Sequence, residues 1–363
     1  MKKNKNYVDL KDQPVPEGQH LLEVDDLKMY FHTEDGVVRA VDGVSYTLDR
    51  GETLGVVGES GSGKSVTAMT IMGLISMPPG KIEGGDVRYR GRSILEMTEE
   101  EMQHIRGNDI AMIFQDPMTS LNPVYKIGKQ VGEGLRLHRG YSKQEALKRA
   151  TELLDLVGIP EPEKRVNEYP HQFSGGMRQR VMIAMALACD PDILIADEPT
   201  TALDVTIQAQ IIELMQEMQE KNGNAIIMIT HDLGVVADMA DKIMVMYAGR
   251  PVEFGTAEEI FYESRHPYTW GLIRSIPEQA IEEKKPLTPI HGNPPSLMNL
   301  PEGCVFSPRC PYATDKCRKQ RPERFVTESG HYSACHYSGD PEFLKNAPVT
   351  SRTRKDSKKG GEA

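Results

Sequence analysis

Residues 58–65 read GESGSGKS and lie between a short apolar run at 55–57 and an apolar, helix-length run at 65–74. A glycine-rich turn between a strand and a helix lets successive backbone N–H groups face phosphate oxygens, and the helix N-terminus attracts the same anion. Lys64 would then reach the β- and γ-phosphates, and the Ser65 hydroxyl would bind Mg²⁺. The stretch predicts a phosphate-binding loop, which this strand and helix context favours over a glycine turn followed by a solvated lysine. The residues expected to contact the nucleotide here are Gly58, Ser60, Gly61, Ser62, Gly63, Lys64, Ser65 and Val66.

Two adjacent carboxylates follow a second apolar run. Residues 193–196 read ILIA and lead directly into Asp197 and Glu198. Ligands of α/β proteins bind at the carboxyl ends of parallel strands, so these acids are expected beside the phosphates. We expect Asp197 to hold Mg²⁺ through water and Glu198 to orient or deprotonate the attacking water. An isolated Asp-Glu pair would more often be a helix cap followed by a solvated acid, but the phosphate-binding loop upstream favours the functional interpretation.

Strands and helices alternate along the chain around these two segments. A hairpin is expected at 22–31 and 41–48, and residues 117–169 are polar and helix-patterned. The other expected helices are 143–157, 177–188 and 206–221, and the other expected strands are 110–114, 225–229 and 243–247. Alternation of this kind predicts an α/β fold with a mainly parallel sheet core. An antiparallel β-hairpin region and a helical insertion complete the prediction.

Composition divides the chain into segments. Residues 1–19 contain Pro14, Pro16 and Gly18 with little periodicity and are expected to be a flexible arm. The main domain is expected at 20–275, with its helical subdomain at about 117–176. Past residue 276 the chain becomes rich in Pro, Gly and Cys, which predicts a small Cys-containing C-terminal module at 276–340. A basic tail at 341–363 is expected to be disordered.

Composition also excludes several function classes. The 363 residues are 39% hydrophobic, which predicts a packed core, and the net charge of −10 argues against a protein that mainly binds nucleic acid. No apolar run approaches the roughly 20 residues that cross a bilayer, and no secretory signal follows the basic first residues. These features predict a cytosolic protein.

The five cysteines are unevenly placed. Cys189 stands alone and is expected to be a small buried hydrophobe. Four others gather near the end of the chain, at Cys304, Cys310, Cys317 and Cys335. In a reducing cytosol such clustering suggests a metal or cluster site before disulfides. The spacing lacks the close C-x₂-C pairs of structural zinc sites, although four thiolates could still hold Zn²⁺.

The segment FSGGMRQ at 173–179 resembles the signature motif of the ABC ATPases, which are P-loop NTPases. Ser174, Gly175 and Gly176 would offer a hydroxyl and bare N–H groups at a helix N-terminus, which makes a second anion site. The resemblance implies that two such cassettes meet head to tail. The phosphate-binding loop of one chain would then share ATP with the signature motif of its partner.

Other elements of that family follow in order. Gln115, before Asp116 and Pro117, resembles the glutamine that senses Mg²⁺, and His231 resembles the switch histidine that contacts the γ-phosphate. Residues 202–204 resemble the D-loop, with Thr201 where serine is more usual. The resemblance thus implies catalytic roles for Lys64, Gln115, Glu198 and His231.

Adenine stacking in this family usually falls to an aromatic in the first hairpin. The position that best matches it is Phe31, and Tyr30 is the competitor. A π-face explains the need for an aromatic but not which one supplies it. The alternative is that Phe31, at strand spacing, is an ordinary core residue.

The C-terminal sequence narrows the resemblance. The segments 266–269 (HPYT), 292–295 (GNPP) and 303–311 (GCVFSPRCP) look like the C-terminal extension of oligopeptide and dipeptide importer ATPases. In that group the cysteine set is implied to bind a [4Fe–4S] cluster, with zinc or reduced thiols as alternatives. The implied partners are two transmembrane permeases, a second ATPase subunit that is homologous or identical, and, indirectly, an extracellular solute-binding protein. The implied location is the cytoplasmic face of a bacterial or archaeal membrane, as a peripheral protein.

Three alternatives remain open from the sequence. Relatives that carry nickel or other small solutes share the C-terminal pattern. A soluble ABC ATPase acting on DNA or ribosomes would predict long coiled coils, two cassettes or a basic face, which are not evident. A redox enzyme built on the cysteines would predict a flavin or dinucleotide motif, and none is found.

Overall fold

The structure, a computed structural model, describes residues 10–115, 120–200, 205–276 and 289–348. Its main sheet has the order β11-β12-β10-β9-β3-β8-β7-β6. The strands from β9 to β6 run parallel, and the strands from β10 outward are antiparallel. Its strands are β3 (Thr53–Val57), β6 (Ile110–Ile113), β7 (Ile193–Asp197), β8 (Ala225–Thr230), β9 (Lys242–Tyr247), β10 (Arg250–Thr256), β11 (Phe325–Val326) and β12 (Tyr332–Ser333). The predicted α/β fold with a mainly parallel core is confirmed.

A second, antiparallel sheet contains the predicted hairpin. Its strands, in the order β2-β1-β4-β5, are β1 (Leu22–Thr33), β2 (Gly36–Leu48), β4 (Gly80–Tyr89) and β5 (Arg92–Ser93). β1 lies between β2 and β4 and pairs with both. The hairpin prediction therefore found two of the strands of a larger sheet.

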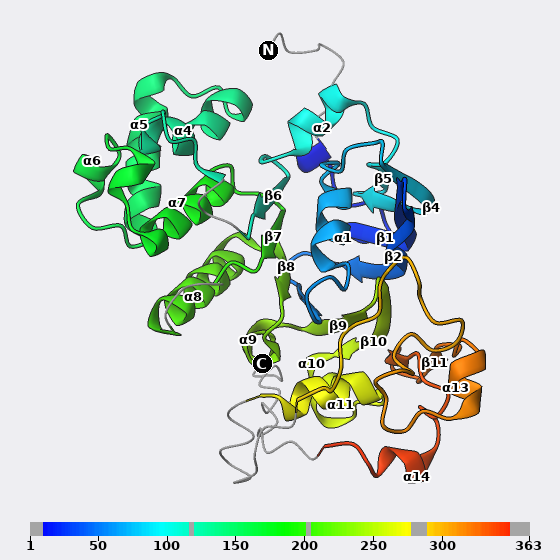
Figure 1. Ribbon diagram of the computed structural model, residues 1–363. Helices are drawn as coiled ribbons and strands as arrows, with labels where there is room; N and C mark the ends of the chain where they lie inside the picture. Colours follow the sequence, from blue (N-terminus) through cyan, green and yellow to red (C-terminus); the bar gives the residue numbers. More distant parts are fainter. Residues whose placement is uncertain (1–9, 116–119, 201–204, 277–288, 349–363) are drawn as a thin grey trace, which may run out of the picture.

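Helices form a subdomain on one side and cover the core elsewhere (Figure 1). The helical subdomain contains α4 (Ile127–His138), α5 (Lys143–Leu156), α6 (Pro162–Arg165), the 3₁₀ turn η2 (Pro170–Gln172) and α7 (Gly175–Leu187). The other helices before the C-terminal region are α1 (Lys64–Ile71), α2 (Glu99–Ile105), α8 (Val205–Asn222), α9 (Leu233–Met239), α10 (Ala257–Tyr262) and α11 (Pro267–Arg274). Capping boxes at Ser142 and Thr98 fix where α5 and α2 begin.

The parallel strands are buried on both faces. Along β7, Ile193 and Ile195 join the core beneath the antiparallel sheet, whereas Leu194 and Ala196 join the core beneath the helical subdomain. Successive side chains of a strand point to opposite faces, so a strand covered on both sides must be apolar throughout. This explains the continuous apolar run before Asp197.

The N-terminal segment differs from the expected flexible arm. Residues 1–9 lie outside the described part, but Leu10–Asp12 form a 3₁₀ turn, η1, and Leu10 is only 1% exposed. Lys11 Nζ donates to the carbonyl oxygens of Asn108, Cys189 and Asp190. The Cys189 carbonyl also accepts from Arg139, so two cations meet the negative end of the α7 dipole. The segment from residue 10 thus packs between the core and the helical subdomain.

The described C-terminal residues contact the main sheet. β12 pairs with β10 and continues the main sheet, and the buried Glu253 of β10 contacts His331 Nε2 at 3.0 Å. The described part of the expected disordered tail also contains structure, because α14 (Pro341–Leu344) places Phe343 against Trp270. The remaining helix of this region is α13 (Asp315–Lys319). The domain boundaries expected at 276 and 341 stay predictions, and the described residues beyond them pack against the main sheet and α11.

None of the helices within the described residues combines the length and the apolar composition that a membrane span requires.

Candidate functional site

The phosphate-binding loop connects β3 to α1, as predicted. Gly58 has φ +152° and Gly63 has φ +101°, and both values favour glycine. A Cβ at Gly58 would lie 2.2 Å from the carbonyl oxygen of Met246, and one at Gly63 would lie 2.3 Å from that of Ala40. Backbone therefore packs against the loop at both ends, and only glycine fits there.

Lys64 is buried at the start of α1. Its Nζ donates to the carbonyl oxygens of Gly58 at 2.7 Å and Glu59 at 3.1 Å, both in the loop. Burial lowers the pKa of Lys64, while the nearby Glu198 and Asp197 carboxylates act in the opposite direction. The cation is therefore held inside the loop and close to both acids of the predicted pair.

Ser65 and Asp197 meet across the site. Ser65 Oγ donates to Asp197 Oδ1 at 3.0 Å, which joins the start of α1 to the end of β7. Burial raises the pKa of Asp197, the Ser65 hydrogen bond opposes that shift, and the Glu198 charge adds to it. Hydroxyl and carboxylate oxygens are the ligands that Mg²⁺ prefers, so this pair fits the predicted metal position.

Two predicted catalytic side chains converge on the carboxylate of a third. Glu198 Oε2 accepts from Gln115 Nε2 at 3.0 Å and lies 3.4 Å from His231 Nδ1. The three residues follow β7, β6 and β8, which are neighbours in the sheet, so their carboxyl ends bring the side chains together. Glu198 has φ +48°, a strained value for a residue with a side chain, and such strain is concentrated at functional sites.

The segment 173–179 forms the start of α7. Ser174 is the N-cap, and its Oγ accepts from the Met177 N–H at 3.3 Å. Ser174 and Gly175 are exposed, and a Cβ built at Gly175 would meet no heavy atom within 4 Å. The helix N-terminus is therefore open to a ligand from outside. Gln179 Nε2 donates to the Pro199 carbonyl oxygen, which connects this helix to the segment after Glu198.

Tyr30 and Phe31 lie in β1 in different surroundings. The Tyr30 hydroxyl donates to Asp42 Oδ1 at 2.9 Å, and burial together with this bond raises the pKa of Tyr30 to about 12. Phe31 is half-buried and packs against the core beneath the antiparallel sheet. The choice of Phe31 as adenine stacker stays a prediction. The predictions for residues 116–117 and 201–204 lie outside the described residues.

A groove of about 690 Å³ opens beside the magnesium position. Ser65, Gln115 and Asp197 line one part of it. Much of the remaining wall is apolar, with methionines from α1 and its C-cap, from β6 and from α7, namely Met69, Met72, Met112, Met182 and Met185. The groove thus continues from the nucleotide side of the sheet to the helical subdomain.

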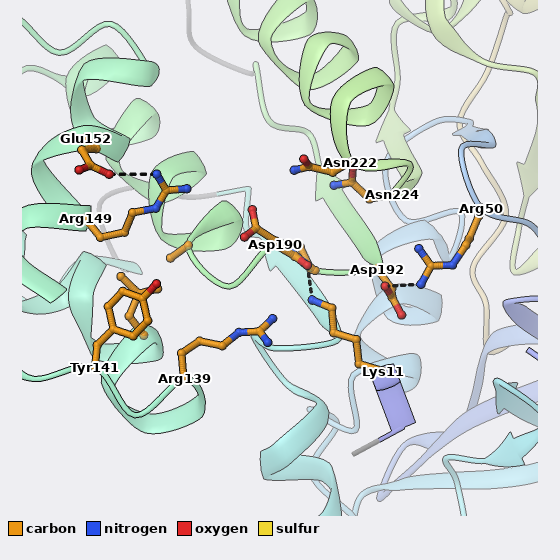
Figure 2. Close-up of a pocket in the computed structure, with 13 residues that line it drawn as sticks. Lys11, Arg50, Arg139, Tyr141, Arg149, Glu152, Asp190, Asp192, Asn222 and Asn224 are labelled. Atoms are coloured by element: carbon orange, nitrogen blue, oxygen red, sulfur yellow. Dashed lines mark hydrogen bonds and ion pairs between the residues drawn. The ribbon is translucent and has the colours of Figure 1, made fainter. Parts of the chain in front are cut away.

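A second hollow, of about 790 Å³, lies at the opposite ends of the parallel strands (Figure 2). Asp192 and Asn224 precede β7 and β8, so the hollow is at the amino ends of these strands. Figure 2 shows Lys11 bonded to the backbone carbonyl oxygen of Asp190 and Arg50 paired with Asp192. Nucleotides bind at carboxyl ends in open α/β sheets, so this hollow is not the nucleotide site.

The four C-terminal cysteines converge. Cys304, Cys310, Cys317 and Cys335 all line one small cavity of about 10 Å³. Burial raises the pKa of the Cys304 thiol, of Cys310 to about 11 and of Cys335 to about 12. Among the described residues, however, no group of three or more His, Cys, Asp or Glu side chains is placed to hold a metal ion. Zn²⁺ binding therefore gains no support from this geometry, and the iron–sulfur cluster stays a prediction.

Cys189 behaves as the sequence suggested, because it is buried and burial raises the pKa of its thiol.

Sequence analysis assigned no role to Glu59, which lies in the phosphate-binding loop, or to Tyr268 and Arg309, which contact it. The Glu59 N–H donates to the Tyr268 hydroxyl at 2.9 Å, and its carboxylate pairs with Arg309. These partners lie 209 and 250 residues away along the chain, so no local pattern could connect them.

Comparisons with known proteins agree with this geometry. The ABC transporter family model matches residues 41–201, and the model of the oligopeptide/dipeptide transporter C-terminal region matches 252–317. The chain is 58% identical to the oligopeptide transport ATP-binding protein OppD of Bacillus subtilis over 86% of this chain and 87% of that protein. It is 52% identical to the dipeptide transport ATP-binding protein DppD of Escherichia coli over 88% of this chain and 97% of that protein.

A solved structure supports the fold. A dimeric ATP-binding cassette, MJ0796, in a post-hydrolysis state bound to ADP and Pi, matches with a TM-score of 0.59 and 29% identity. The match covers 65% of this chain and 98% of that chain.

Proposed function

This chain belongs to the ATP-binding subunits of ABC transporters, in the oligopeptide and dipeptide branch, and from that premise we propose how it works. The chain is an ATPase, and its hydrolysis of ATP to ADP and phosphate drives peptide transport. We propose that the transport is import of oligopeptides or dipeptides. The comparisons do not favour the nickel, other small-solute or soluble alternatives.

One observation carries the proposed mechanism: the loop around Lys64 and the acids at 197–198 meet in one site. Bound Mg²⁺ would offset the negative charge of the phosphate oxygens, held by Ser65 and by Asp197. Lys64 and the loop N–H groups bind the phosphates. Glu198 holds the attacking water and accepts its proton, while Gln115 and His231 fix the position of that carboxylate.

A second cassette would complete the site. Ser174, Gly175 and Gly176 lie at the open N-terminus of α7, where they would bind the γ-phosphate held by a partner. The similar cassette MJ0796 is described as dimeric, which supports this proposal. The partner would be a homologous ATPase subunit or a second copy of this chain.

Two transmembrane permeases are the proposed membrane partners. The groove beside Gln115 is apolar and rich in methionine, and such a surface can adapt to an apolar segment of another protein. A permease segment bound there would contact Gln115, whose amide donates to Glu198. The chain would then be a peripheral protein on the cytoplasmic face of the membrane. An extracellular solute-binding protein would deliver the peptide.

Loss of peptide uptake tests this function. In cells whose own copy of the gene is deleted, the wild-type chain should restore ATP-dependent uptake of a labelled oligopeptide or dipeptide, and two permeases should co-purify with it from detergent-solubilised membranes. Restored nickel uptake without peptide uptake, or recovery of the chain with no permease, would contradict the proposal.

A [4Fe–4S] cluster is proposed for the four cysteines. The support is their convergence on one cavity, together with the burial that a cluster site requires. The thiolates of Cys304, Cys310, Cys317 and Cys335 would hold the cluster.

Metal analysis decides between these states of the cysteines. Protein purified without oxygen should contain about four iron and four sulfide per chain and absorb visible light, and Cys310→Ser should lose iron while Cys189→Ser retains it. Colourless protein that contains one zinc, or no metal at all, would rule the cluster out.

A further inference from the structure

A carboxylate lies inside the phosphate-binding loop. Glu59 follows Gly58 directly, in a loop whose other features attract anions. Its negative charge would repel the phosphates of a nucleotide unless a cation balanced it. Because Lys64 Nζ binds the Glu59 backbone carbonyl, the position of this residue also affects the lysine.

The balancing cation comes from the C-terminal region. Arg309 Nη1 donates to Glu59 Oε2 at 2.5 Å and Nη2 donates to Oε1 at 2.9 Å, which is a two-point contact. The Arg309 side chain is 4% exposed and that of Glu59 is 28% exposed. A paired carboxylate and guanidinium in such surroundings are strongly coupled, and the Glu59 carboxylate raises the pKa of Arg309 above its usual value.

Further contacts fix Arg309 in place. Its Nε donates to the His291 carbonyl oxygen at 2.9 Å, and Nη2 donates to that of Ile290 at 3.2 Å. The guanidinium also lies 5.8 Å from the ring centre of Tyr247. Little conformational freedom remains for the side chain to lose when it binds Glu59, so the ion pair is preorganised.

The backbone of Glu59 is held by the same part of the molecule. Its N–H donates to the hydroxyl of the buried Tyr268, at the start of α11. The rings of Tyr268, Tyr247 and Phe306 pack together, with centroids 4.6 to 5.3 Å apart. Phe306 and Cys310 line the cysteine cavity, so the contacts run without a break from that cavity to the loop.

We propose that Arg309 is a positioning residue for ATP binding, which acts through Glu59 by neutralising its carboxylate and fixing the loop that holds the phosphates. This inference rests on the proposed ATPase function. It gives the C-terminal region a direct effect on nucleotide affinity.

A double-mutant cycle on the full chain tests the inference. Arg309→Gln should weaken Mg-ATP binding by roughly 10- to 100-fold, because it leaves Glu59 unpaired beside the phosphates. The KM for ATP should rise by a similar factor while kcat at saturating ATP changes little, since Arg309 does not touch the reacting atoms. Glu59→Gln combined with Arg309→Gln should recover most of the affinity, because the repelling charge is gone.

The controls separate this effect from misfolding. Arg309→Lys keeps the charge but loses the two-point contact, so its affinity should be intermediate. Arg318→Gln removes an exposed pair of the same region and should leave ATP binding unchanged. Unchanged ATP affinity in Arg309→Gln would overturn the inference. It would also be overturned if the double variant lost as much binding free energy as the two single variants together. Wild-type protein that binds no Mg-ATP would instead remove the proposed ATPase function.

Discussion

Glu198→Gln should leave ATP binding near the wild-type level and lower the rate of ATP hydrolysis by about 100-fold or more. The amide has nearly the same shape as the carboxylate but cannot accept a proton from water. Glu198 is also the shared partner of Gln115 and His231, so the change removes the carboxylate that these two side chains hold in position. Steady-state phosphate release and titration with a fluorescent nucleotide measure the two quantities separately.

In the proposed pair of cassettes, ATP that is not hydrolysed should keep the two subunits together. Glu213→Gln, an exposed acid on α8, serves as the matched control and should hydrolyse ATP normally. A wild-type rate of hydrolysis in Glu198→Gln would mean that another group activates the attacking water. Loss of ATP binding would mean that Glu198 mainly stabilises bound ATP rather than the transition state.

The parts of the site that the sequence could predict are those encoded by neighbouring residues. The loop at 58–65 needs a strand, glycines and a helix in immediate succession, and the acids at 197–198 need only an apolar strand before them. Each element carries its own local signal, and parallel pairing then places the loop, Gln115, Glu198 and His231 at one edge of the sheet.

What the sequence could not predict depends on contacts between distant segments. Leu10 is a single apolar residue among charges, so nothing local indicates that it is buried. β4 contains Gly84 and Gly85 and several charges, and β10 contains Pro251, all of which weaken a strand pattern. No local pattern indicates the extension of the main sheet by β12 or the contact of Arg309 with Glu59, because the partners are far apart along the chain.

Lys64→Ala should abolish most nucleotide binding, in contrast to Glu198→Gln. The lysine is the buried cation of the loop, and removing one partner of a buried charge contact costs about 2 to 5 kcal/mol. That loss corresponds to a Kd for ATP raised by roughly 30-fold to several thousand-fold. Titration of the full chain with Mg-ATP, at concentrations up to several millimolar, gives the value directly.

Thermal unfolding shows whether the loop itself survives the change. Without nucleotide the variant loses the bonds from Nζ to the carbonyl oxygens of Gly58 and Glu59 and the attraction to the Asp197 and Glu198 carboxylates, so its Tm should fall. The increase in Tm that ATP gives the wild-type chain should disappear, because a ligand stabilises only a protein that binds it. Lys164→Ala, which removes an exposed lysine of α6, should keep that increase. If Lys64→Ala kept it too, the phosphates would bind elsewhere and the site assigned here would be wrong.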